Sequence, residues 1–109
     1  MGLDIRFIHR KNIVCPKCGE IVAQTDADCI DGGGGGWYPL LESLGYYVPY
    51  EQRTEENDWY GKDMVLTEEQ AKEVYQFAKK NDLYGSCRLP RMIAEAIYEK
   101  DSIVVNADW

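Results

Sequence analysis

The segment Cys15-Pro16-Lys17-Cys18-Gly19 is the feature that most constrains the fold of this chain. Two cysteines separated by two residues and followed by glycine form a tight turn whose backbone N–H groups point at both sulfur atoms. The glycine tolerates the positive φ that such a turn often requires. Ile13-Val14 leads into the turn and Glu20-Ile21-Val22-Ala23 leads out of it. The sequence therefore predicts a β-hairpin with the cysteine turn at its tip.

This turn suits a zinc ion, because zinc is held by thiolates in tetrahedral geometry. A complete zinc ribbon has a second Cys-x-x-Cys pair, which this chain lacks. We predict a structural zinc ion that cross-links a small core, with the ligands Cys15, Cys18, Cys29 and His9, and with Cys87 as the rival fourth ligand. The alternatives are a turn that keeps its shape without metal, or a redox pair of thiols. The redox alternative is disfavoured because such a pair should begin a helix, whereas glycine and a β-rich stretch follow here.

The charge of the chain is strongly uneven. The net charge is −7 over 109 residues. Residues 1–18 hold four basic side chains and one acidic side chain, a net +3, which leaves −10 for the rest. We expect the acidic part to be repelled by nucleic acid unless the basic end acts alone. The chain also lacks a basic amphipathic helix for an anionic membrane, so we expect no membrane partner.

The start of the chain does not have the pattern of a secretion signal, because no apolar run follows a charged start. No stretch approaches 18 apolar residues, the length of a membrane span. We therefore expect a cytoplasmic protein, in which the four cysteines are thiols or metal ligands rather than disulfides.

Hydrophobic patterning predicts strands at both ends of the chain. Residues 3–7 alternate apolar and charged side chains, which is typical of a strand with one buried face. A short extended piece is expected at residues 28–30. Residues 102–106 contain three consecutive β-branched residues, which indicates a central strand buried on both faces. We also expect an extended segment at residues 46–50, at a sheet edge because of Pro49.

Two main helices and one short helix are predicted. Thr67-Glu68-Glu69-Gln70 is a capping box that opens a helix ending near residues 81–83, before Gly85. A second helix is expected from Pro90 to Lys100. Residues 37–45 form a short helix, while the five glycines 32–36 form a loop. We therefore predict one α+β domain over residues 1–109, in which a small antiparallel sheet includes both terminal strands and the two main helices pack on one face.

The two ends of the chain carry a resemblance. The opening Met1-Gly2-Leu3-Asp4-Ile5 and the closing Val105-Asn106-Ala107-Asp108-Trp109 look like those of small uncharacterised proteins of bacteriophages and prophages. This resemblance implies an α+β fold with adjacent terminal strands and no established activity. The cysteine turn, in contrast, resembles the zinc knuckle of zinc ribbons and rubredoxin-like modules.

Catalysis is the function class that the residues support least, and we predict no catalytic residue. His9 is the only histidine, so any Ser-His or Cys-His scheme would have to use it. The glycine run does not end in the Gly-Lys-Ser/Thr of a phosphate-binding loop, because Trp37 and Tyr38 stand there. The acidic side chains of residues 51–63 are expected to be solvated.

Aromatic residues predict a binding surface next to the glycine loop and the acidic stretch 51–63, since aromatics dominate interface hot spots. The alternative is that they complete a small core. The residues are Trp37, Tyr38, Tyr46, Tyr47, Trp59 and Tyr60. We therefore expect a binding or adaptor protein with a protein partner.

Two alternatives to this adaptor role remain open. In the first, the chain is an acidic decoy of a nucleic-acid-binding protein. In the second, the basic end binds nucleic acid through Arg6, Arg10, Lys11 and Lys17.

Overall fold

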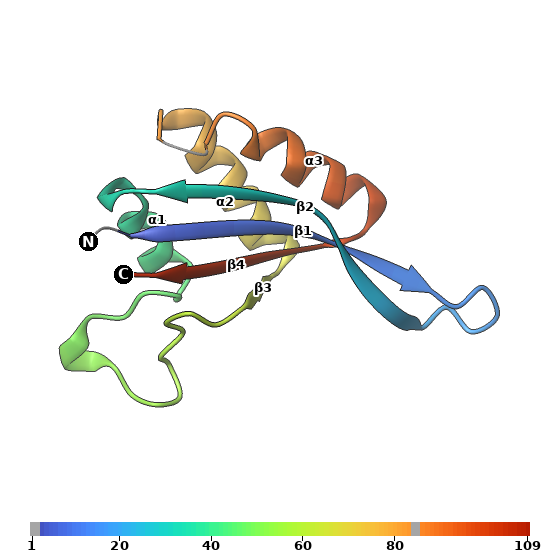
Figure 1. The fold of residues 1–109 in the computed structure, drawn as a ribbon, viewed down its shortest axis with the longest axis horizontal. Coiled ribbons are helices and arrows are strands. Elements are labelled where there is room, and N and C mark those ends of the chain that lie inside the picture. Colours follow the sequence, from blue (N-terminus) through green and yellow to red (C-terminus); the bar gives the residue numbers. More distant parts are fainter. Residues whose placement is uncertain (1–2, 84–85) are drawn as a thin grey trace.

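An antiparallel sheet organises the chain (Figure 1). The computed structural model describes residues 3–83 and 86–109. Met1 and Gly2 of the Met-Gly-Leu-Asp start and the expected helix stop Gly85 lie outside these residues. The described strands form one four-stranded sheet in the order β2-β1-β4-β3. They are β1 (Asp4–Val14), β2 (Ile21–Gly33), β3 (Met64–Leu66) and β4 (Ser102–Asp108).

The two terminal strands lie side by side, as predicted. β1 pairs antiparallel with β4, with Phe7 opposite Val105. β4 lies between β1 and β3, so the predicted central position of the β-branched run is confirmed. Val104 and Val105 are fully buried, which explains why this strand is apolar on both faces. β3 was not predicted, because three residues are too few to show an alternating pattern.

Helices cover one face of the sheet (Figure 1). α2 (Glu68–Lys80) begins at the predicted capping box, in which the side chains of Thr67 and Gln70 each accept from the other residue's backbone N–H. α3 (Leu89–Glu99) is capped by Lys100, which adopts a left-handed conformation with φ 59°. The short α1 (Tyr38–Ser43) starts with proline in its first turn. The α+β fold with two main helices on one side is therefore confirmed.

The core lies between the helices and the covered face of the sheet. Trp37 is its centre, because the ring lies 5.4 Å from Phe7 and 5.6 Å from Phe77 between ring centroids. Val74 of α2 and Ile93 of α3 are fully buried above the sheet. These contacts bury the apolar stripe that the helical spacing predicts.

Two segments differ from the sequence prediction. Residues 46–50 do not form an edge strand: Tyr46 packs into the core, and Pro49 precedes a 3₁₀ turn at Tyr50–Gln52. The glycine run is not a single loop either. Gly32 and Gly33 complete β2, and a 3₁₀ turn occupies Gly35–Trp37. Glycine can pair as an ordinary strand residue at the sheet end, which composition alone does not reveal.

The β1–β2 hairpin extends well beyond the rest of the sheet (Figure 1). Residues 13–23 contact no other strand, and all except the half-buried Cys15 are exposed. We call these residues the arm. The radius of gyration is 14.4 Å, larger than the ~13 Å of a compact chain of this length. Among the described helices, none combines the length and apolarity that crossing a bilayer requires.

Candidate functional site

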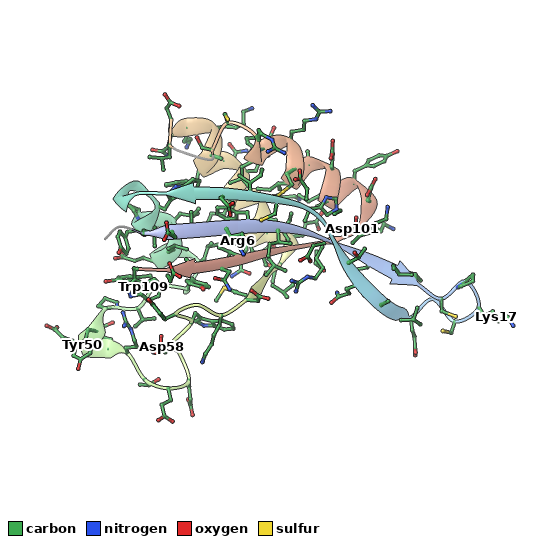
Figure 2. The ribbon with its side chains drawn as sticks, viewed as in Figure 1. Arg6, Lys17, Tyr50, Asp58, Asp101 and Trp109 are labelled. Atoms are coloured by element: carbon green, nitrogen blue, oxygen red, sulfur yellow. The ribbon has the colours of Figure 1, made fainter. Side chains whose placement is uncertain are left out.

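The cysteine turn closes the arm at the point farthest from the helices (Figure 2, where Lys17 marks it). Val14 and Ile21 form the last strand pair. The Cys15 N–H donates to the Glu20 carbonyl at 2.8 Å, and the Gly19 N–H donates to the Cys15 carbonyl at 2.9 Å. Gly19 has a φ of 74°, which is why glycine is needed there.

The turn stabilises a thiolate at Cys15. The backbone N–H groups of Cys18 and Lys17 and the Cys18 thiol hydrogen-bond to the Cys15 sulfur and lower the pKa of its thiol below the usual 9.0. A thiolate is the form that binds a metal ion. Cys15 is half-buried and Cys18 is exposed, so both sulfurs are accessible. The turn can therefore supply two adjacent ligands to a metal.

The other predicted ligands do not join this pair. His9 pairs with Asp28, and Cys29 pairs with Ile8, midway along the hairpin. Because a strand rises ~3.3 Å per residue, these positions lie roughly 20 Å from Cys15. Successive residues of a strand face opposite sides, so His9 and Cys29 also point away from each other. The hairpin is longer than the sequence prediction assumed, which separates the four residues.

Cys87 lies in the turn before α3 and is exposed. It lines a shallow hollow together with Cys29. This rival ligand is therefore near Cys29 and far along the hairpin from the cysteine turn. Burial and the neighbouring Asp31 raise the pKa of the Cys29 thiol, which disfavours the thiolate there.

His9 belongs instead to a cluster with Asp101 and Glu99 on the body side of the arm, in which His9 is buried and Glu99 is exposed. Its Nε2 lies 2.7 Å from Oδ2 of Asp101, and the two side chains are only 6% and 4% exposed. Oδ1 of Asp101 accepts from the Asn12 N–H at 3.1 Å. Burial raises the pKa of the Asp101 carboxyl, but the hydrogen bonds from His9 and Asn12 outweigh it and hold the pKa below 3.8.

Glu99 completes a group of three side chains that could hold a metal ion with His9 and Asp101. Both oxygens of Asp101 are already hydrogen-bonded, so the geometry is that of a clamp between the arm root and the α3–β4 turn. Sequence reasoning missed Asp101 and Asn12, because an aspartate between a helix and a strand has the same pattern as a solvated turn residue.

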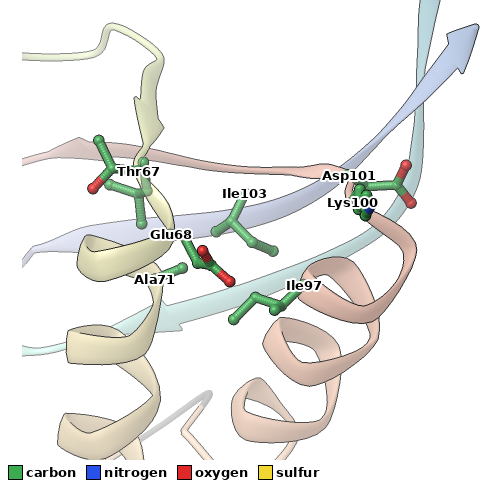
Figure 3. Close-up of a pocket in the computed structure, with 8 residues that line it drawn as sticks. Thr67, Glu68, Ala71, Ile97, Lys100, Asp101 and Ile103 are labelled. Carbon is green, nitrogen blue, oxygen red and sulfur yellow. The ribbon is translucent and has the colours of Figure 1, made fainter.

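A hollow of about 370 Å³ opens beside Asp101 between the start of α2 and the end of α3 (Figure 3). Ala71, Ile97 and Ile103 give it apolar lining, and Glu68 and Lys100 give it charged lining. This volume is at the lower end of small-molecule sites. The polar side chains that line it are Thr67, whose hydroxyl caps α2, together with Glu68, Lys100 and Asp101.

The predicted aromatic surface is only partly at the surface. Trp37 and Tyr46 are fully buried and cannot contact a partner. The Tyr46 hydroxyl donates to the Lys62 carbonyl at 2.7 Å and accepts from the Ala107 N–H at 2.8 Å. The alternative reading, that these aromatics complete the core, is correct for both residues.

Tyr47 and Tyr60 pack against Trp109, which the predicted surface did not include, whereas Tyr38 contacts Tyr47 and Trp59 contacts Tyr46. The Trp109 ring lies 5.0 Å from Tyr47 and 4.9 Å from Tyr60, and the Arg53 guanidinium lies 5.3 Å from it. Tyr38, Tyr47 and Trp59 are half-buried against the core, and Tyr60 is 48% exposed.

The basic side chains near the start of the chain are mostly paired with acids. Arg6 contacts Asp31 at 3.0 Å. Arg10 contacts Asp26 at 2.9 Å and Asp63 at 3.6 Å, and Lys11 contacts Glu99 at 4.0 Å. Lys17 lies apart from these three at the tip of the arm (Figure 2). Within residues 3–18, the positive charges of Arg6, Arg10 and Lys11 are thus neutralised locally.

Comparison of the chain with protein-family models, with curated proteins and with solved structures gave no match.

Proposed function

We propose that this chain is a non-catalytic binding or adaptor protein that contacts a protein partner through its arm, with a zinc ion bound by Cys15 and Cys18. The observation that carries the proposal is the apolar character of the arm. Beside the cysteine turn, the exposed fractions are 46% for Ile13, 49% for Val14, 55% for Ile21 and 64% for Val22. A two-stranded ribbon with two solvated faces is marginally stable by itself, and contiguous exposed apolar side chains are typical of interaction sites.

In this proposal the zinc ion orders the tip of the arm, whereas the sequence predicted that it cross-links the core. Both thiols come from one four-residue turn, so a zinc ion bound there joins no distant parts of the core. The metal would instead fix the shape of the tip that meets the partner. The lowered pKa of Cys15 supports metal binding near neutral pH, because less free energy is needed to deprotonate the thiol.

We propose the arm as the binding surface, in place of the aromatic residues beside the glycine loop. Burial of Trp37 and Tyr46 removes two of the six aromatic residues predicted to form that surface. Direct nucleic-acid binding by the basic end is less supported, because Arg6 and Arg10 are paired with acids. A phage or prophage source remains a prediction from the two chain ends.

Affinity capture with three forms of the protein tests the proposal. The forms are the natural chain, the tip variant Cys15→Ser/Cys18→Ser and the matched control Cys29→Ser/Cys87→Ser. We expect the natural chain and the control to retain zinc and the same partner, and the tip variant to lose both. Equal zinc content or equal partner retention in the tip variant would contradict the proposal.

A further inference from the structure

We infer that a second copy of this chain completes the zinc site, so that Cys15 and Cys18 of two chains hold one zinc ion between the tips of two arms. This inference rests on the proposed zinc binding and adds the partner that completes it. The first argument is coordination number. A structural zinc ion takes four protein ligands, and the turn offers two.

The part of the chain that the structure describes does not bring two further ligands to this pair. Among the described residues, the group of three or more side chains suited to a metal is His9, Glu99 and Asp101, at the root of the arm. Cys29 pairs with Ile8, roughly 20 Å from Cys15 along the hairpin. Two ligands from each of two identical turns would satisfy the zinc ion about a twofold axis, the commonest symmetry of homodimers.

The shape of the molecule permits this meeting. The turn stands at the end of the arm, away from the helices and the long 46–63 loop (Figures 1 and 2). Cys18 is exposed, and residues 16–22 on either side of it are exposed as well. A second tip can therefore approach both sulfurs without a contact between the two bodies.

Charge also favours an encounter through the arms. The whole chain has a net charge of −7, yet within residues 13–23 the charged side chains are Lys17 and Glu20, which balance. All of the excess negative charge therefore lies outside the arm. Each arm extends about four residues, or roughly 13 Å, from the body to its tip. Two arms that meet tip to tip therefore hold the acidic bodies roughly 25 Å apart, which exceeds the ~8 Å Debye length of physiological salt.

The residues around the turn suit a shared zinc site in charge and in apolar character. Four thiolates and one Zn²⁺ carry a net −2, and Lys17 of each copy supplies +1 beside them. Each thiol that binds releases its proton to solvent, and no redox step takes place. The exposed Val14, Ile21 and Val22 of both copies lie next to the shared ion, where they can cover one another.

Cobalt(II) titration of the Cys29→Ser/Cys87→Ser form tests the inference, because this form keeps only Cys15 and Cys18. Four-sulfur coordination then requires two chains. We expect the tetrahedral thiolate absorption to saturate at half an equivalent of cobalt, and sedimentation to report a dimer that chelator converts to monomer. Saturation at one equivalent on a monomer would overturn the inference while leaving zinc binding at the tip intact. Absence of any metal binding would overturn the inference and the zinc part of the proposed function together.

A second pair of variants distinguishes a loss of dimer contacts from a general loss of stability. Val22→Ser changes an exposed residue beside the turn, and Val65→Ser changes a comparably exposed valine (59%) on the edge strand β3. We expect Val22→Ser to weaken the metal-dependent dimer at least tenfold, since two copies of the side chain are lost, and Val65→Ser to leave it unchanged. Equal effects of both changes, or a dimer that persists in chelator, would refute the shared zinc site.

Discussion

Replacing Asp101 with alanine removes the carboxylate that joins the root of the arm to the turn between α3 and β4. In the natural chain this carboxylate accepts from His9 Nε2 at 2.7 Å and from the Asn12 N–H at 3.1 Å. The variant leaves both groups without this partner in a region where the His9 side chain is 6% exposed. A buried polar group left unpaired costs about 1–3 kcal/mol.

Two groups lose their partner, so the free energy of unfolding could fall by up to ~6 kcal/mol, and the neighbouring hollow reduces this loss. Asp101 lines the 370 Å³ hollow, so water can reach the vacated site and satisfy part of the lost hydrogen bonding. We therefore expect the free energy of unfolding to fall by about 3 kcal/mol rather than by the ~6 kcal/mol upper sum of two orphaned groups. For a chain of this length, that corresponds to a lower melting temperature by about 12 °C.

Urea unfolding and thermal melting at pH 7 measure this change. Glu95→Ala is the matched control, because Glu95 is an exposed carboxylate whose partner Arg91 is on the same helix, and such pairs contribute about 0.5 kcal/mol or less. A loss of less than 1 kcal/mol in the Asp101 variant would refute the clamp.

The same carboxylate gives the clamp a pH dependence of known sign. The folded-state pKa of Asp101 lies below its ordinary value of 3.8, despite the opposing effect of burial, because His9 and Asn12 hydrogen-bond to the charged form. The stabilisation is therefore complete above this ordinary value and is lost as the pH falls below it, through the folded-state pKa. The stability difference between the natural chain and Asp101→Ala should narrow below about pH 4. A difference that stays constant down to pH 2 would contradict the assignment.

Three further predictions concern the tip, the core and a helix cap. In chelator, Cys15→Ser/Cys18→Ser should leave the melting temperature within ~2 °C of that of the natural chain, since exposed turn residues outside the core contribute about 0.5 kcal/mol or less; a drop above 5 °C in calorimetry would show that the tip thiols stabilise the core without metal. Tyr46→Phe should cost about 2 kcal/mol in urea unfolding, because the buried Ala107 N–H loses its acceptor; an unchanged midpoint would contradict this. Thr67→Ala should cost about 1 kcal/mol, with Thr67→Ser as the near-neutral control, measured by circular dichroism; equal losses in both variants would exclude the cap as the cause.

Local signals in the sequence were enough to predict much of the fold. The capping box at Thr67 located the start of α2 to the residue, because its side-chain chemistry acts within one turn. The β-branched run near residue 104 located a central strand, because burial on both faces requires apolar side chains at every position. Alternation in residues 3–7 indicated a terminal strand, which the structure pairs with β4.

Long-range arrangements were not predictable in the same way. The register of β1 and β2 sets Cys29 opposite Ile8, and a bulge between His9 and Arg10 shifts the pairing before the arm begins. Neither the register nor the length of the hairpin is encoded in the spacing of the cysteines. Trp37 and Tyr46 have side chains suited equally to a core and to an interface, so only their packing distinguishes the two roles.

The hairpin thus has two ends with separate energetics. At its root, His9 and Asn12 are tied to Asp101 by hydrogen bonds in a nearly buried setting, so changes there alter the stability of the whole domain. At its tip, a bound metal orders a short exposed turn outside the core. Its binding free energy drives association, which makes the proposed dimer a function of metal concentration through linkage. Because the dimer forms from folded chains, the same linkage stabilises the fold as the metal concentration rises.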